Sequence, residues 1–128
     1  PPIAVAMVKK EIVKMAEIAI ENYNTAERII DYCMRHYSEN ISLEILSQEF
    51  HISKYRISHI FNNGINVSLP NFINWIRVSQ ACKLLRNSNK TILEIAITVG
   101  FGSLRNFNRS FYSILKMKPN EYRNDVRK

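Results

Sequence analysis

The sequence predicts an all-α protein in which a pair of helices joined by a short turn occurs twice. Two observations support this fold class. Apolar residues recur at spacings of three and four along most of the 128 residues, as they do on one face of an α-helix. From Ser42 onward the chain also repeats itself with a period of 50 residues and no gaps, so one structural solution is used twice. Identical positions include Leu43-Glu44-Ile45 with Leu93-Glu94-Ile95, Ser53 with Ser103, and Phe61 with Phe111.

Two helices are expected before the repeat. Residues 5–20 form an amphipathic pattern whose apolar stripe is Val5, Val8, Ile12, Met15, Ala16 and Ala19. A second helix is expected to begin near Asn24, where Thr25 is suited to cap a helix N-terminus, and to end before residues 38–40. The first stripe has no partner within the repeat, which leaves two alternatives open: it docks back on the rest of the chain, or it pairs with a second chain.

Each copy of the repeat has helix-starting and turn signals at corresponding places. The expected N-cap residues of its helices are Ser42, Ser53, Thr91 and Ser103. Short turns separate the paired helices at residues 50–52 and 100–102. We therefore expect one helix-turn-helix unit over about residues 42–63 and another over about 91–115, joined by a long linker helix over about 70–86.

Charge is unevenly distributed along the chain. The formal net charge is +7, of which residues 1–50 contribute −3 and residues 51–128 contribute +10. No Asp or Glu lies between Glu49 and Glu94. A long stretch with only positive charges repels itself unless it faces a polyanion, which indicates nucleic acid or an anionic membrane surface as the partner. The alternative is a basic face that is simply solvated.

Several classes of chemistry lack the residues they need. The three glycines match no nucleotide-binding loop, and Cys33 and Cys82 do not have the spacing of a zinc site. The three histidines are not paired with each other or with carboxylates at ligand or catalytic spacing. We expect no enzyme activity, no metal and no cofactor, and two reduced, buried thiols. The longest apolar run, Ile3 to Val8, is too short to cross a bilayer, so no membrane is expected and the chain is expected to act in the cytoplasm.

The second helix of each copy has one apolar face and one polar face. Inward positions are Ile57, Ile60 and Phe61 in the first copy and Phe107 and Phe111 in the second. The opposite faces are without acidic residues and contain Arg, Lys, Asn, Ser, Tyr and His, the side chains that contact base edges and phosphates in a major groove. A linker helix of 17 residues spans about 25 Å. Adding the half-widths of the units at its two ends brings the two outward helices close to one turn of B-DNA apart, which is about 34 Å. One monomer is therefore expected to enter two successive major grooves.

Six segments of the chain together match a known family pattern: Ser42 to Leu46, Ser53 to Phe61, Arg77 to Leu85, Ile92 to Phe101, Phe107 to Phe111 and Pro119 to Arg123. Through these segments residues 41–123 resemble the DNA-binding domain of the arabinose-regulator (AraC/XylS) family of bacterial transcription regulators. The last three segments form that family's signature. Three positions depart from it: Asn66 and Lys116 stand where the family usually has Gly, and His59 stands where it commonly has Arg or Lys.

The resemblance implies a set of base-contacting residues: Tyr55, Ser58 and His59 in the first unit and Arg105, Asn106 and Arg109 in the second. Side-chain chemistry supports the second set independently, because Arg forms paired hydrogen bonds to guanine and Asn forms them to adenine. Phosphate contacts are expected from Ser53, Lys54, Arg56, Lys90 and Ser103. Arg77 is expected to form an ion pair or cap carbonyl groups, and the residues Phe61, Trp75, Phe101, Phe111 and Tyr122 are expected in the core.

The resemblance implies sequence-specific binding of double-stranded DNA and regulation of transcription beside a promoter, with RNA polymerase as a further partner. It also implies a division into a DNA-binding domain over residues 25–128 and a segment 1–24 that is an amphipathic helix or the linker remnant of a regulatory domain. The chain begins with Pro-Pro, in keeping with a piece of a longer protein. If the N-terminal stripe pairs with a second chain, the partner is a second copy, and a homodimer could form through this helix or through the regulatory domain; docking of the stripe back on the chain is the alternative. The alternative function is a basic helical module that binds an acidic protein or an anionic surface.

Overall fold

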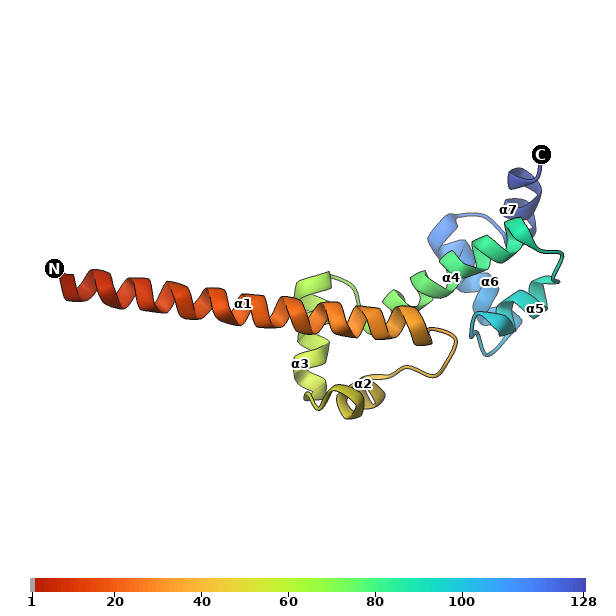
Figure 1. The fold of residues 1–128 in the computed structure, drawn as a ribbon. Helices are drawn as coiled ribbons and strands as arrows, with labels where there is room; N and C mark the ends of the chain where they lie inside the picture. The colour runs from red at the N-terminus through yellow and green to blue at the C-terminus, as the bar shows by residue number, and fades with distance from the viewer. Residues whose placement is uncertain (1) are drawn as a thin grey trace. The chain divides into compact units, whose positions relative to one another are not determined.

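The computed structural model describes residues 2–128 and shows an all-α chain with no strand in that range (Figure 1). The elements are α1 (Pro2–His36), α2 (Leu43–Phe50), α3 (Lys54–His59), the π-helical segment η1 (Ile60–Ile65), α4 (Leu69–Asn87), α5 (Ile92–Thr98), α6 (Leu104–Leu115) and α7 (Pro119–Val126). The chain divides into two compact units, and the boundary lies between Tyr32 and Cys33. The predicted fold class is confirmed: a first helix-turn-helix unit (α2, α3 and η1) and a second (α5 and α6) are joined by α4 and preceded by α1.

The N-terminal region forms one helix where the sequence predicts two. The predicted break near Asn24 is wrong, because α1 continues from Pro2 to His36. Thr25 is only 7% exposed, and its hydroxyl donates a hydrogen bond to the Glu21 carbonyl at 2.9 Å. A threonine that bonds to the carbonyl four residues back lies within a helix and does not start one. The chain also has no Gly or Pro between residues 3 and 36 to interrupt α1.

All four N-caps predicted within the repeat are present, whereas the one predicted at Thr25 is not. Each hydroxyl accepts a hydrogen bond from the backbone N–H three residues later: Ser42 from Ile45 (3.2 Å), Ser53 from Arg56 (3.1 Å), Thr91 from Glu94 (3.1 Å) and Ser103 from Asn106 (3.1 Å). Ser68 caps α4 in the same way, with Pro70 in the first turn, where a missing N–H costs no helix bond. The caps therefore determine where the second helix of each unit begins.

Left-handed backbone ends several of the helices. Asn66 and Lys116 have φ values of 64° and 59°. These are the two positions where the family that the sequence resembles usually has Gly. The turn of the second unit contains Gly100 with φ 107°, and a Cβ at this residue would lie 2.8 Å from Ser38 Cα. Glycine is required there because both the backbone conformation and the approach of Ser38 exclude a side chain.

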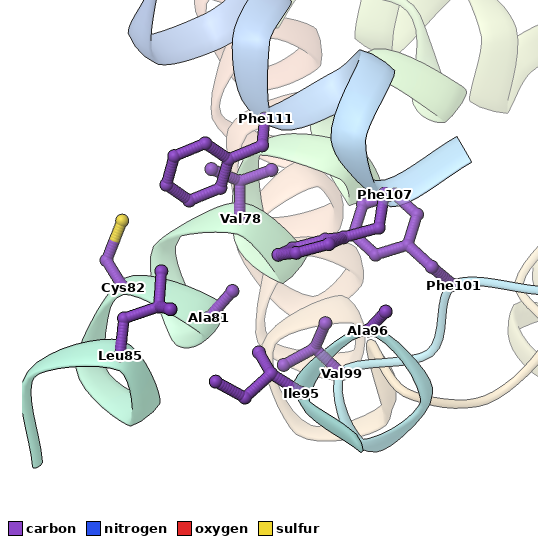
Figure 2. Close-up of a cluster of buried hydrophobic side chains, with 10 residues drawn as sticks. All are labelled: Val78, Ala81, Cys82, Leu85, Ile95, Ala96, Val99, Phe101, Phe107 and Phe111. Atoms are coloured by element: carbon purple, nitrogen blue, oxygen red, sulfur yellow. The ribbon is translucent and has the colours of Figure 1, made fainter. Parts of the chain in front are cut away.

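The main hydrophobic core lies where α4 packs against α5 and α6, the second helix-turn-helix unit (Figure 2). Its buried residues are Val78, Ala81, Cys82, Leu85, Ile95, Ala96, Val99, Phe101, Phe107 and Phe111. The aromatic rings form a continuous chain, from Phe101 to Phe107 (centroids 5.4 Å apart), to Phe111 (5.6 Å) and to Tyr122 of α7 (5.9 Å). Such aromatic pairs stabilise a core beyond their area of burial.

Trp75 is a correction to the predicted core. Its side chain is 52% exposed on α4, whereas Phe61, Phe101 and Phe111 are buried as predicted. Apolar residues occupy several faces of α4 because this helix packs on both helix-turn-helix units. The sequence pattern of α4 therefore does not show which of its large side chains is left uncovered.

Arg77 of α4 anchors the connection between α1 and α2. Its Nε donates to the Tyr37 carbonyl at 2.7 Å and its Nη2 to the Glu39 carbonyl at 3.0 Å. The guanidinium also lies 5.7 Å from the centroid of the Phe101 ring. Burial lowers the pKa of the Arg77 guanidinium. The expectation that Arg77 caps carbonyl groups is confirmed.

Candidate nucleic-acid interface

The outward ridge of α6 displays the three predicted base-contacting residues of the second unit. Arg105, Asn106 and Arg109 are all exposed, while Phe107 and Phe111 on the opposite face are fully buried. Arg109 Nη2 donates a hydrogen bond to Asn106 Oδ1 at 2.9 Å, which orients both side chains. Arg105 has no hydrogen-bond partner among residues 2–128. The ridge thus presents one free guanidinium beside an ordered Arg–Asn pair.

The outward face of α3 is smaller and more aromatic. Tyr55 is 80% exposed, and its ring stacks on His59 with centroids 6.2 Å apart. The side-chain amide nitrogen of Asn63 donates a hydrogen bond of 2.8 Å to Nδ1 of the exposed His59 ring. Ser58 is half-buried and its hydroxyl accepts from the Asn62 amide at 3.1 Å. The three residues lie on one helix face as predicted, and no hydrogen bond in the described chain joins them to the α6 set.

The η1 segment follows α3 directly and was not predicted. Asn66 N–H bonds to the Phe61 carbonyl five residues back, the pattern of a π-helix. Asn62, Asn63 and Gly64 are weak helix formers, which is the only sequence signal for a disturbed helix at this place. The second helix of the first unit, α3, therefore has six α-helical residues, compared with the twelve of α6.

The predicted phosphate contacts have different surroundings. Lys54 Nζ forms an ion pair with Glu44 Oε1 at 3.1 Å, and both side chains are more than half exposed. The Ser53 and Ser103 hydroxyls are used as N-caps, so these residues offer their backbone N–H groups to an anion. Lys90 is exposed and Arg56 is half-buried. Glu44, the ion-pair partner of Lys54, was not foreseen from the sequence.

The electrostatic surroundings favour an anionic partner. No acidic residue occurs in α3, η1, α4 or α6. Glu44 and Glu94 lie in α2 and α5, the first helix of each unit. Positive charge is thus concentrated on the helices that carry the predicted DNA contacts.

The described chain holds no group of three His, Cys, Asp or Glu side chains that could ligate a metal ion. Cys33 and Cys82 are free and buried, and burial raises the pKa of the Cys33 thiol to about 11 and that of Cys82 in the same direction. A thiol with a raised pKa is a poor nucleophile, in keeping with the predicted structural role. Between residues 2 and 128 no helix has the length and apolar character needed to cross a membrane.

Comparison with known proteins gives the following similarities. Residues 46–125 match the family described as "Helix-turn-helix domain". An HTH-type transcriptional regulator of Staphylococcus aureus is 31% identical over 107 residues, which are 84% of this chain and 14% of that protein. The chain therefore spans about one seventh of the length of this relative.

Two solved structures are also similar. The C-terminal domain of AraT, a response regulator from Geobacillus stearothermophilus, has a TM-score of 0.75 and 25% identity, covering 79% of this chain and 84% of that one. The DNA-binding domain of AdpA, a global transcriptional factor solved in complex with a target DNA, has a TM-score of 0.74 and 24% identity, covering 80% and 92% of the two chains. The fold is that of DNA-binding transcription regulators.

Proposed function

The chain belongs to the AraC-type helix-turn-helix family, and we propose that it binds double-stranded DNA sequence-specifically and thereby regulates transcription. The observation that carries the proposal is the repetition of one arrangement in a single chain. Ser53 and Ser103 each start a helix that buries its apolar face and exposes a face without acidic residues. A helix of this kind, set at an angle to a preceding helix, is the element that enters a major groove.

In this proposal α6 supplies the stronger base contacts. Arg105, which is free of intramolecular partners in the described chain, donates two hydrogen bonds to O6 and N7 of a guanine. Asn106 contacts an adenine, and its bond to Arg109 fixes the direction of both side chains. The pair therefore loses little side-chain freedom on binding.

The role of α3 rests on neutral side chains. Tyr55 and His59 form an exposed, stacked pair that offers apolar surface to a thymine methyl group and a ring N–H to a base acceptor. Ser58 lies between them and offers a hydroxyl. These contacts are weaker and less selective than those of an arginine, so α3 contributes less to base discrimination than α6.

Phosphate contacts position both helices on the duplex. Lys54 exchanges Glu44 for a phosphate, Lys90 and Arg56 bind further phosphates, and the N-terminal N–H groups after Ser53 and Ser103 face the backbone. With α4 holding the two units, one monomer contacts two successive major grooves about 34 Å apart. The bound site is then asymmetric, because the two outward faces differ.

Regulation requires more than DNA binding. We infer that the bound protein acts beside a promoter, where it recruits or blocks RNA polymerase. The Staphylococcus aureus relative is far longer than the matched segment. We therefore propose that an effector-responsive domain in the same polypeptide controls the DNA-binding domain.

The N-terminal part of α1 is the basis for a proposed homodimer. Val5, Val8, Ile12 and Met15 are each more than half exposed and recur at alternating spacings of three and four, the pattern of a coiled-coil seam. Sedimentation equilibrium should show a dimer that Ile12→Gln dissociates and Glu17→Gln, on the charged face, does not. A monomeric wild-type chain would leave dimerisation to a domain outside these residues.

The proposed function is tested by selecting bound duplexes from a random pool. The chain should recover one asymmetric motif, and its affinity for that duplex should exceed that for a random duplex about 1,000-fold or more at physiological salt. A basic interaction module is the alternative, and it would bind all duplexes equally. In that case an acidic protein or an anionic vesicle would compete with DNA, and no motif would be recovered.

A further inference from the structure

Trp75, the single tryptophan of the chain, lies beside a surface pocket that neither recognition helix forms alone. The pocket has a volume of about 570 Å³. It is lined from α4 by Asn71, Asn74 and Trp75, and from α6 by Arg109, Ser110 and Ser113. We call it the α4–α6 pocket. A tryptophan that is 52% exposed in such a place is available to a partner.

The chemistry of the pocket fits a phosphodiester and its sugar. Every polar side chain that lines it carries a hydrogen-bond donor: two amides, two hydroxyls, an indole N–H and a guanidinium. No carboxylate lines it, and neither α4 nor α6 contains an acidic residue. The Trp75 ring and Ile114 add apolar surface beside these donors. Donors surround the oxygens of a phosphate, and apolar surface suits the deoxyribose next to it.

The position of the pocket relates it to the proposed DNA complex. Arg109 belongs both to the base-contacting ridge of α6 and to the wall of the pocket, so the pocket borders the groove that α6 enters. A chain that occupies two successive major grooves must cross the minor groove between them, and α4 is the element that joins the two units. In such a complex the sugar-phosphate backbone that borders this minor groove would pass alongside α4.

We propose that the α4–α6 pocket binds the DNA backbone between the two major grooves, with Trp75 against a sugar and Asn74 and Ser113 donating to phosphate oxygens. The proposal rests on the proposed function, and it adds a third contact region to the two recognition helices. Such contacts carry no base identity. Their effect is to fix the spacing of the two units on the duplex.

The single tryptophan allows a direct test. A fluorescein-labelled duplex from the random-pool selection is added to the full chain, and label anisotropy measures binding independently of the tryptophan. Acrylamide quenching of Trp75 should fall severalfold when the chain is saturated with this duplex. Saturation by label anisotropy with unchanged quenching would overturn the inference and leave the proposed function standing. If no duplex binds, both fail.

A pair of matched variants tests the polar contacts. Asn74→Asp places a carboxylate in the pocket, whereas Asn124→Asp makes the same change at an exposed position of α7 outside it. Asn74→Asp should weaken binding to the selected and the random duplex severalfold and to the same extent, while Asn124→Asp leaves both near wild type. Circular dichroism serves as the control that both variants fold. Equal effects of the two variants, or an Asn74→Asp effect confined to the selected duplex, would contradict a backbone contact.

Discussion

The two helix-turn-helix units are built from one repeat but differ in their second helices. Both begin with a serine cap and bury the residue four positions later, Ile57 in α3 and Phe107 in α6. The outward residues have diverged, with a Tyr–His pair in the first unit and an Arg–Asn pair beside a free Arg in the second. The residues that determine the fold are therefore shared, whereas those proposed to contact bases are not.

The frameworks of the two units also differ. The second unit packs three aromatic rings in a chain that continues to Tyr122 of α7, and its turn brings Gly100 close to Ser38. In the first unit the only buried ring, Phe61, packs on Phe72 of α4, and α3 changes to π-helical geometry after six residues. The longer α6, with arginines on its outward face, and the shorter α3, with neutral base-contacting candidates, predict unequal contributions to stability and to DNA recognition.

The largest difference is expected at the glycines. Gly100→Ala should lower the free energy of unfolding by about 1–3 kcal/mol through backbone strain, because φ is 107° at this residue. The contact with Ser38 should lower it further, because the added Cβ would lie 2.8 Å from Ser38 Cα. Gly64→Ala in the first unit should cause no loss, since no atom lies within 4 Å of its Cβ position. Urea unfolding monitored by circular dichroism measures both. Equal losses would show that the second unit is no more constrained than the first.

Removing base contacts should separate the two recognition helices. Arg105→Ala or Arg109→Ala should each weaken binding to the selected duplex by about 1–3 kcal/mol and relax preference at one or two base pairs. Tyr55→Ala or His59→Ala should cost about 0.5–1.5 kcal/mol, as expected for neutral hydrogen bonds. Fluorescence anisotropy with single-base variants of the duplex measures both quantities. An equal loss on random duplexes would make the arginines phosphate contacts.

The smallest effects concern phosphate contacts. Lys90→Ala should reduce the slope of log affinity against log salt by about one unit. Lys54→Ala should have a smaller effect because Lys54 is paired with Glu44 in the free protein, and Glu44→Gln should strengthen binding by releasing it. Titrations at four salt concentrations give the slopes. Weaker binding by Glu44→Gln would show that the ion pair positions Lys54 instead of competing with the phosphate.

Local signals in the sequence were sufficient for the helix starts and the buried faces. Hydroxyl side chains cap helices through bonds three residues away, and the inward positions of α6 follow from the helical period, so both were predictable. Trp75 was misplaced because its exposure depends on how α4 packs on two units at once. The Lys54–Glu44 ion pair was missed because its partners are ten residues apart on different helices, and only the packing of α2 against α3 brings them together.

The continuous α1 shows a different limit. Thr25 is as suited to an N-cap as to an interior position, and only its backbone environment decides between them. The site residues were proposed from the repeat and the family resemblance. The structure places those of each helix on one exposed face, and their roles remain predictions for the experiments above.

The central claim is that one chain contacts two successive major grooves with a fixed spacing, and footprinting with an insertion tests it most directly. Two protected major-groove segments should lie about 10 bp apart on one face of the selected duplex. Inserting 5 bp between them turns the second segment to the opposite face, so high affinity and one of the two footprints should be lost. Unchanged affinity with both footprints after the insertion would contradict a rigid two-groove contact by a single chain.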